Sequence, residues 1–223
     1  MALRIVLLGA PGVGKGTQAR GLASQFQLPH VSTGEIFRRH VQEGSPLGEK
    51  VRKYMEGGTL VPDDLTCQVV VERLEEQDCA GGYILDGFPR SLPQAIYLDE
   101  YLARNGESLS LAVSIEVPDE EVVERLCARR FCPACGAIYN MKFDPPASNE
   151  RCDREDCGQP LARRSDDNEE TVRERLRIHH DTTEPIVDFY RRINKLQVIQ
   201  GSGLEPAEVQ ERIGEAISAV EAV

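Results

Sequence analysis

The chain has 223 residues, and 26 basic against 37 acidic side chains give it a formal charge of −11. This acidity argues against partners recognised through bulk positive charge, namely nucleic acid and anionic membranes. Forty percent of the residues are apolar, which is enough to bury a real core and excludes general disorder. The length fits one sizeable domain, or a core that carries small insertions.

The basic residues are 21 Arg and only 5 Lys. A guanidinium grips carboxylate or phosphate in two places, whereas a lysine is a mobile point charge. The excess is therefore compatible with anion recognition, and codon bias is the alternative explanation.

Seven cysteines are present, and four of them, Cys132, Cys135, Cys152 and Cys157, lie within one short stretch. An odd total and this clustering argue against a disulfide scaffold. No small-residue cleavage site follows the first apolar run, and no run approaches the roughly 18 residues of a membrane span. We expect a protein of the reducing cytoplasm with no membrane partner.

The first predicted element is a strand over residues 3–8, whose continuous apolar sequence LRIVLL suits a parallel sheet covered on both faces. The loop GAPGVGKGT follows at residues 9–17, and then apolar residues recur at helical spacing. Strand, glycine loop with lysine, and helix together predict a phosphate-binding loop. Its backbone N–H groups would surround phosphate oxygens, and Lys15 would reach the outer phosphates. A glycine turn without a ligand is the alternative.

Three further motifs follow this loop: VSTGEIFR at residues 31–38, GTLVPD at 58–63 and YILDGFPR at 83–90, with Gln94 shortly after the last. The loop itself departs from the strict pattern, because Gly16 and then Thr17 follow Lys15 where Ser or Thr is usual. This GxPGxGKGT form resembles the nucleoside monophosphate kinases. Together the motifs resemble the adenylate kinase family over most of the first half of the chain.

Each motif residue also has a physical reason for its place. Asp86 ends a buried strand beside the loop, where it is suited to hold Mg²⁺ through the water shell of the ion. Arg38 and Arg90 can each fork onto a monophosphate. The amide of Gln94 offers a donor and an acceptor to an adenine edge.

The resemblance implies two nucleotide sites. The ATP site would comprise Gly12, Val13, Gly14, Lys15, Gly16, Thr17, Arg125 and Arg129. The AMP site would comprise Thr33, Arg38, Thr59, Leu60, Val61, Gly87, Arg90, Gln94, Arg164 and Arg175. The residues implied to act in catalysis are Lys15, Asp86, Arg90, Arg125, Arg129, Arg164 and Arg175.

Between these motifs and the cysteines, residues 111–117 predict another strand, and Pro118 is expected in the first turn of the next helix. Earlier, between residues 30 and 61, two helical segments flank residues 43–46 with no strand signal. That stretch therefore predicts a small helical insertion.

The cysteine stretch opens with C-x2-C and a glycine, and closes with C-x4-C. Residues 137–143 between the pairs alternate as a hairpin strand does. Two pairs joined by a hairpin-length spacer predict a tetrahedral structural zinc site with no open position. Unmetallated cysteines, or two disulfides formed on isolation, are the alternatives, and iron or cobalt could replace zinc.

The module resembles the metal-bearing LID of bacterial adenylate kinases, whose closing pair is usually C-x2-C. The longer turn here leaves room for Asp153 or Asp156 to replace a cysteine. The resemblance further implies that Arg125 stacks on the ATP adenine. Arg129, Arg164 and Arg175 would contact phosphates, oriented by the acidic pair Asp166 and Asp167, whereas Arg173 is expected to be peripheral.

The last part of the chain predicts a helix over residues 171–194 interrupted near Pro185, a strand over 196–199 and a terminal helix over 205–220. His179 and His180 are adjacent, so on a helix they point apart and shared ligation is not expected. His30 and His40 have no partner in the sequence. No histidine is assigned a role.

These patterns predict an α/β fold with a P-loop NTPase-type parallel sheet flanked by helices. The expected core is residues 1–29, 62–128 and 165–223, with a monophosphate-binding insertion at 30–61 and a zinc-ribbon-like LID at 129–164. The resemblance implies a monomeric phosphotransferase that moves the terminal phosphoryl group of MgATP to AMP and gives two ADP.

Two alternatives stay open. One is a kinase that prefers UMP, CMP or GMP as acceptor. The other is a zinc-ribbon binding module with the loop as a nucleotide-dependent switch, against which the charge of −11 and the aromatic content of 5% both weigh.

Overall fold

A computed structural model describes residues 2–148 and 150–221. Its central sheet contains β1 (Leu3–Leu8), β2 (His30–Ser32), β3 (Gly82–Asp86), β4 (Leu111–Glu116) and β7 (Leu196–Gln200), in the order β2-β3-β1-β4-β7. Every neighbouring pair is parallel. The predicted fold class is confirmed, and the strand expected over residues 3–8 has those bounds.

The edge strand β2 lies inside the stretch for which the sequence predicted no strand, so that prediction was wrong. Three residues are too few to show the alternation that marks a strand. The backbone of β2 pairs with β3, and Ser32 is opposite Asp86. Residues 30–32 therefore belong to the sheet rather than to the helices that follow.

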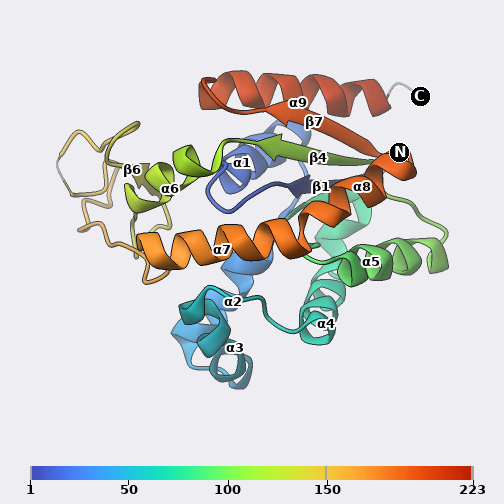
Figure 1. The fold of residues 1–223 in the computed structure, drawn as a ribbon, viewed down its shortest axis with the longest axis horizontal. Coiled ribbons are helices and arrows are strands. Elements are labelled where there is room, and N and C mark those ends of the chain that lie inside the picture. Colours follow the sequence, from blue (N-terminus) through green and yellow to red (C-terminus); the bar gives the residue numbers. More distant parts are fainter. Residues whose placement is uncertain (1, 149, 222–223) are drawn as a thin grey trace.

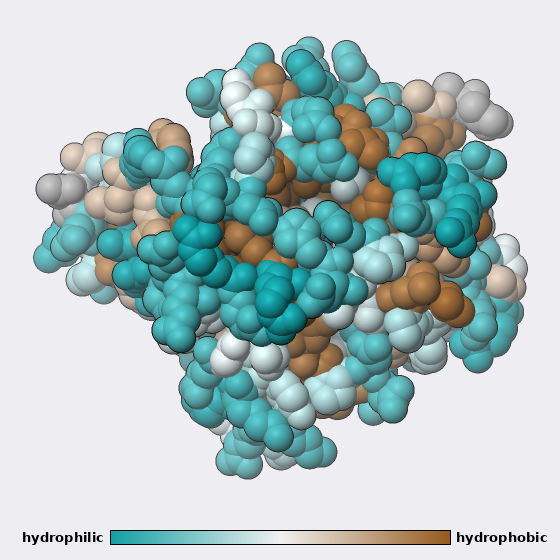
Figure 2. Space-filling model, viewed as in Figure 1, coloured by the Kyte–Doolittle hydropathy of each residue, from teal (hydrophilic) through white to brown (hydrophobic). Residues whose placement is uncertain are grey.

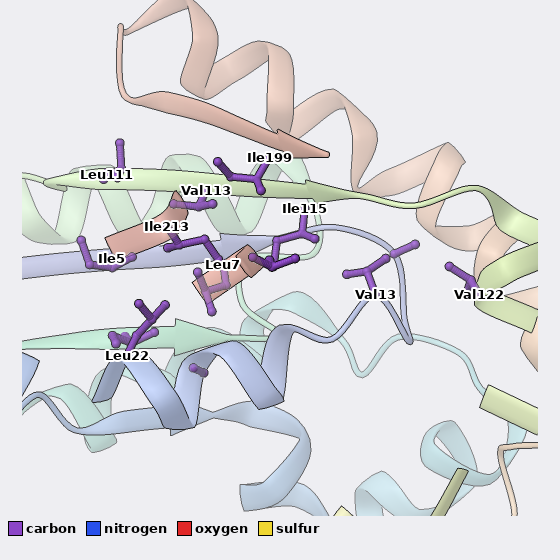
Figure 3. Close-up of a cluster of buried hydrophobic side chains, with 14 of the residues drawn as sticks. Ile5, Leu7, Val13, Leu22, Leu111, Val113, Ile115, Val122, Ile199 and Ile213 are labelled. Atoms are coloured by element: carbon purple, nitrogen blue, oxygen red, sulfur yellow. The ribbon is translucent and has the colours of Figure 1, made fainter. Parts of the chain in front are cut away.

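Helices cover both faces of the sheet (Figure 1). On one face, α1 (Lys15–Phe26) and α9 (Pro206–Glu221) pack on each other and on the side chains of Ile5 and Leu7. Figure 3 shows this cluster, in which Leu22 and Ile213 meet the strand residues Ile5, Leu7 and Val113. Each fully buried side chain of this type contributes roughly 1.5–3 kcal/mol relative to exposure.

The other face carries α4 (Asp63–Leu74), α5 (Leu92–Arg104) and α8 (Glu184–Arg192). Val6 and Leu8 point to this side, because successive side chains of a strand alternate. They pack with Leu98 of α5 and Tyr190 of α8. A short 3₁₀ turn, η1 (Gln77–Gly81), leads from α4 into β3.

Two further helices, α2 (Thr33–Glu43) and α3 (Pro46–Gly57), lie beside the sheet. Ser32 caps the N-terminus of α2, and Ser45 caps that of α3. The two helices have a small apolar cluster of their own, centred on Phe37 and Val51. We call this pair the arm. Its helical content agrees with the sequence prediction apart from β2.

The chain leaves the core through α6 (Asp119–Cys127) and returns through α7 (Glu169–Thr182). Pro118 is the residue before α6 rather than part of its first turn, which corrects the prediction for that helix. Between α6 and α7 lie β5 (Arg129–Phe131) and β6 (Ile138–Asn140), paired antiparallel. We call residues 129–164 the lid.

The predicted interruption near Pro185 is present, because α7 ends at Thr182 and Pro185 lies in the first turn of α8. In Figure 1, α7 runs from the lid toward α8, between the sheet and the arm. Figure 2 shows a mainly hydrophilic face with separate small apolar areas. Among the described residues, no helix is long and apolar enough to cross a membrane.

Candidate active site

The glycine loop connects β1 to α1 at the carboxyl edge of the sheet. Gly14 is the residue before α1 and has a φ of 101°, a left-handed conformation that favours glycine. No side chain caps this helix, so its first N–H groups are directed to the space beyond the helix N-terminus. A helix start of this kind suits phosphate oxygens.

Lys15 lies in the first turn of α1 and is partly buried. Its Nζ donates to the carbonyl oxygens of Gly9 at 2.7 Å and Ala10 at 2.8 Å. Burial lowers the pKa of Lys15 to about 7, and the nearby guanidinium groups of Arg90 and Arg175 add to that effect. The ammonium therefore lacks enough negative charge around it, which an anionic ligand would supply.

Asp86 ends β3 beside this helix start, where its Oδ2 would be 3.3 Å from a Cβ built at Gly16. His30 Nε2 is 3.3 Å and Ser32 Oγ is 3.4 Å from the same oxygen. Burial alone would raise the pKa of Asp86, but the His30 hydrogen bond and the charge of Lys15 outweigh burial and lower it. The carboxylate is therefore ionised and held in one orientation.

A cavity of about 60 Å³ lies between the arm and the core. We call it the acceptor cavity. All the residues predicted for the AMP site line it except Arg164, namely Thr33, Arg38, Thr59, Leu60, Val61, Gly87, Arg90, Gln94 and Arg175.

Hydrogen bonds fix the floor of the acceptor cavity. Thr33 Oγ1 donates to the Gly87 carbonyl at 2.8 Å, and Arg90 Nε donates to the same oxygen at 2.9 Å. Gln94 accepts from the Arg90 backbone N–H at 2.7 Å and donates to Asp63 at 2.6 Å. One N–H of the Gln94 amide is left for a ligand.

A second cavity of about 40 Å³ adjoins the first and includes Lys15 with Arg90 and Arg175 in its lining. We call it the transfer cavity. Gly58, Leu60 and Gly87 also line both spaces. The glycine loop and the acceptor cavity are thus joined through one cationic region.

The arm reaches across this region to α7. A Cβ built at Gly58 would come within 2.7 Å of Thr171 Cγ2, so only glycine allows this approach. From the arm, Arg38 has Asp166 and Arg129 as charged neighbours. Arm, lid and core therefore meet around the cavities.

Asp166 and Asp167, which follow the lid closely in the sequence, bind two of the predicted arginines. Arg129 Nε donates to Asp167 at 2.8 Å, and Arg175 Nη1 donates to Asp166 at 2.6 Å. Asp167 is completely buried. These ion pairs fix both guanidinium groups where α6 and α7 approach the cleft.

Arg164 has no such carboxylate contact within the described part of the chain. Its Nε is buried with no hydrogen-bond partner there, and its guanidinium carbon is 5.7 Å from the centre of the Phe131 ring. Burial, with the charges of Arg129 and Arg38, lowers the pKa of Arg164 to about 9. A buried donor without a partner, set among cations, suits an anionic ligand.

The cleft as a whole carries more positive than negative charge. Its cations are Lys15, Arg38, Arg90, Arg129, Arg164 and Arg175, and its carboxylates are Asp86, Asp166 and Asp167. With all of these groups ionised, six positive against three negative charges leave an excess of +3. Burial lowers the pKa of Arg90 to about 10, and the pKa values of Arg38 and Arg175 are lowered for the same reason.

Two of the other arginines lie elsewhere. Arg125 pairs with Glu121 and donates to the Gly201 carbonyl at 3.4 Å, and it lines neither cavity. Arg173 is 47% exposed and pairs with Glu120 and Glu169. The peripheral position predicted for Arg173 is confirmed.

The four clustered cysteines converge in the lid. Their Sγ atoms all lie within 4.8 Å of one another, and the pairs Cys132–Cys157 and Cys135–Cys152 are 3.5 Å apart. Four thiolates about 2.3 Å from one zinc ion would be about 3.8 Å apart, so the set fits a tetrahedral metal. A disulfide needs about 2.05 Å, and the cysteines are free.

The two aspartates considered as substitutes are not part of this group among the described residues. Asp153 instead accepts hydrogen bonds from the Ala147 N–H at 2.8 Å and the Ser148 hydroxyl at 3.2 Å. Tyr139 Oη lies 3.2 Å from Cys152 Sγ and accepts from the Asp153 N–H at 2.9 Å. The longer closing turn is thus accommodated by hydrogen bonds around the cysteines.

The sequence analysis missed three residues of the site. His30 contacts Asp86, Asp63 holds Gln94, and His179 lines the transfer cavity. Only Asp63 lies within a motif, and no local sequence pattern connects it to its partner Gln94. The two histidines acquire their neighbours only when β2 and α7 pack beside the loop.

A lysine-bearing glycine loop at the carboxyl edge of a parallel sheet, joined to an arginine-lined second cavity, defines a P-loop nucleotide-binding protein of the phosphotransferase type. The adenylate kinase family profile matches residues 7–195. The chain belongs to the adenylate kinase family.

Relatives named adenylate kinase cover almost the whole chain. The protein of Clostridium perfringens strain 13 is 48% identical over 202 residues, covering 91% of this chain and 92% of its own. That of Ruminiclostridium cellulolyticum is 46% identical over 215 residues, covering 96% and 99%. That of Moorella thermoacetica is 46% identical over 207 residues, covering 93% and 94%.

Proposed function

We propose that the protein catalyses reversible transfer of the terminal phosphoryl group of MgATP to AMP, giving two ADP. The observation that carries the proposal is the excess of partly buried positive charge around the transfer and acceptor cavities. Two phosphate-bearing substrates on either side of this region would supply the missing negative charge. Membership of the adenylate kinase family supports the same reaction.

The roles of the residues follow from where they lie. The backbone of Gly12 to Thr17 and the Lys15 ammonium would hold the donor phosphates. Arg38 and Arg90 would aim the AMP phosphate in line with the donor. Arg129, Arg164 and Arg175 would stabilise charge on the transferred group. No general base is required, because a phosphate oxygen of AMP is already a nucleophile, so catalysis is mainly positioning and charge neutralisation.

The residues around the helix start fit a magnesium site. Asp86 presents an ionised carboxylate there, and Thr17 presents an exposed hydroxyl in the first turn of α1. Both are oxygen ligands of the kind Mg²⁺ uses, directly or through its waters. When bound with ATP, the ion neutralises phosphate charge.

The bases would be held by the walls of the cleft. Thr33 and the segment Thr59 to Val61 would close over the AMP base and ribose, and Gln94 would use its remaining amide N–H on the adenine edge. Arg125, next to Gly201, would stack on the ATP adenine. Thr33, the Thr59 to Val61 segment and Gln94 together would select AMP over other acceptors.

We further propose that the core, the arm and the lid move as separate units, with the boundaries 1–29, 62–128 and 165–223 for the core, 30–61 for the arm and 129–164 for the lid. Because β2 pairs with β3 in the sheet of the core, we propose that the moving part of the arm begins at Thr33 rather than at residue 30. Closure would exclude water from the transferred phosphoryl group.

The direct test is a coupled assay of ADP formation from ATP with AMP, then with UMP, CMP and GMP. ADP formation that depends on AMP and exceeds that with the other acceptors is expected. Hydrolysis of ATP without dependence on any monophosphate would contradict the proposal and support a nucleotide-switched binding module.

The lid cysteines Cys132, Cys135, Cys152 and Cys157 would hold a structural Zn²⁺ ion, with all four positions filled by thiolates. Metal analysis of protein purified under reducing conditions is expected to give about one zinc per chain. Stripping the metal with a chelator and restoring Mg²⁺ should lower the melting temperature while some activity is retained. Protein that contains almost no bound metal would contradict the site.

A single chain contains every group named above, so we propose that the protein acts as a monomer on ATP, AMP and ADP in the cytoplasm. No nucleic acid or membrane partner is needed for this reaction. Sedimentation of the purified protein at assay concentration checks the oligomeric state.

A further inference from the structure

A groove adjoins the transfer cavity on the side away from the arm. This groove, of about 700 Å³, lies beyond the carboxyl ends of β4 and β7, next to α8. We call it the outer groove. Its polar lining includes Glu116, Asp119 and Asp188, and it is open to solvent.

Among the residues that the structure describes, two line both the outer groove and the transfer cavity: Gly9 and His179. Gly9 has no side chain, so the His179 imidazole is the side chain that the two spaces share. His179 follows Arg175 by one helical turn on α7, and the two therefore lie on the same face of the helix. That face is directed at Lys15 and Arg90 across the transfer cavity.

The His179 imidazole has the charge state expected of a side chain that separates the two spaces. Burial lowers the pKa of His179 to about 3, and the charges of Lys15, His180 and Arg90 lower it further. The ring is therefore neutral at cellular pH and can lie beside the cations without repulsion. It occupies space at the wall without adding charge to the phosphate site.

The adjacent histidine holds the helix in register from the groove side. His180 Nε2 is 2.9 Å from Asp119 at the start of α6, and its Nδ1 is 3.1 Å from Glu184 at the start of α8. His180 lines the outer groove and not the transfer cavity. These contacts fix α7 with His179 turned toward the phosphate site.

Water in the outer groove is a competitor for the reaction under "Proposed function", on which this inference rests. If water reached the γ-phosphorus, its oxygen would form the new P–O bond and the bond to the β–γ bridging oxygen would break. ADP and inorganic phosphate would be the products, with the proton released to solvent. A phosphotransferase must prevent this loss of ATP.

We propose that His179 closes the transfer cavity against water from the outer groove, and so directs the γ-phosphoryl group to AMP rather than to water. His179 is a water-excluding residue and not a catalytic one. The volume of its ring, rather than a ring nitrogen, performs the role.

The test compares ATP hydrolysis in the absence of AMP with phosphoryl transfer in its presence. His179→Ala opens the wall and is expected to raise hydrolysis relative to transfer about tenfold. His179→Phe refills the space without nitrogens and should keep the ratio within about twofold of the wild type. Arg191→Ala is the control, since it removes a large side chain that lines the outer groove and not the transfer cavity, and its ratio should also be that of the wild type.

Melting curves and AMP-dependent transfer are measured for every variant, so that loss of the fold is recognised. An unchanged ratio in a folded His179→Ala enzyme would overturn the inference, as would equal increases in His179→Ala and His179→Phe. Either result leaves the proposed function standing, because transfer by the wild type is measured separately. Wild-type protein that forms no ADP from ATP and AMP would instead refute the proposed function itself.

Discussion

The arginines of the cleft and those of the outer surface have the same side chain and opposite environments. On the surface, Arg173 and Arg177 are paired with neighbouring carboxylates, and these hydrogen bonds raise their pKa values. In the cleft, burial lowers the pKa values of Arg90 and Arg164. The surface arginines have carboxylate partners on the protein itself, whereas the cleft arginines would gain negative charge from a bound anion.

This difference explains how an acidic protein binds polyanions. The charge of −11 is a sum over the whole chain. The cleft has a local excess of positive charge in a partly buried region, where each charge acts more strongly than on the surface. Binding anions therefore relieves an electrostatic cost that folding imposed.

The largest expected effect is at the centre of the cleft. Lys15→Met removes the ammonium that we propose holds the donor phosphates, and we expect turnover to fall at least about 10³-fold. The fold should survive, because Lys15 makes only two hydrogen bonds to the loop. ADP formation and circular dichroism measure the two properties. Near-normal turnover would remove Lys15 from the mechanism.

Arg164→Leu tests the unpartnered guanidinium, and turnover is expected to fall about 10²-fold. The melting temperature should stay the same or rise, since the change removes a partly buried charge that has no carboxylate contact within residues 2–148 and 150–221. Arg164→Lys is the control that keeps the charge but loses the planar fork. A clear fall in melting temperature with wild-type turnover would make Arg164 structural.

Nucleotide binding should be accompanied by proton uptake. Because the pKa of Lys15 is about 7 in the ligand-free protein, its amine is mostly neutral at pH 8. Bound phosphate raises that pKa, so ATP binding at pH 8 should take up about one proton. Calorimetry in buffers of different ionisation enthalpy measures this uptake, and equal uptake by Lys15→Met would contradict the assignment.

The same lowered pKa affects the stability of the ligand-free protein. Between pH 7 and 10.5 the unfolded chain binds more protons than the folded one, because the ordinary pKa of lysine is 10.5. This group therefore makes the free energy of unfolding rise with pH across that window. Urea unfolding at several pH values should show the contribution in the wild type and not in Lys15→Met.

The smallest effect is expected on the surface. Arg173→Leu breaks ion pairs with Glu120 and Glu169, all three residues being exposed. Turnover should remain within about twofold of the wild type, because exposed pairs of this kind contribute little. A loss comparable to that of Arg164→Leu would erase the distinction between the two groups of arginines.

The elements that could be predicted from sequence were those with long, uniform signals. The apolar run of β1, the helix pattern after the loop and the paired cysteines each lie within one stretch of chain. The strand β2 was not predicted because it has only three residues and its apolar Val31 is isolated between polar neighbours. A short edge strand is stabilised by its neighbour β3 rather than by its own sequence.

The candidate site divides in the same way. The residues carried by motifs, including Lys15, Asp86 and Arg90, were named from their order along the chain. His30 and His179 were not, since their neighbours Asp86 and Lys15 are distant in sequence. No spacing rule connects residues that meet only when β2 and α7 pack against the loop.

The sequence by itself determined the parallel α/β class, the phosphate loop, the arginines of the motifs and the cysteine set, because each depends on local order and spacing. Only the tertiary structure decided which charges are buried together. Packing lowers the pKa values of Lys15 and Arg164, so that bound anions would stabilise their charged forms. Arg173, in contrast, is paired with a carboxylate on the surface. The physical reason is that desolvation and partner distance are properties of the packed chain and not of any residue alone.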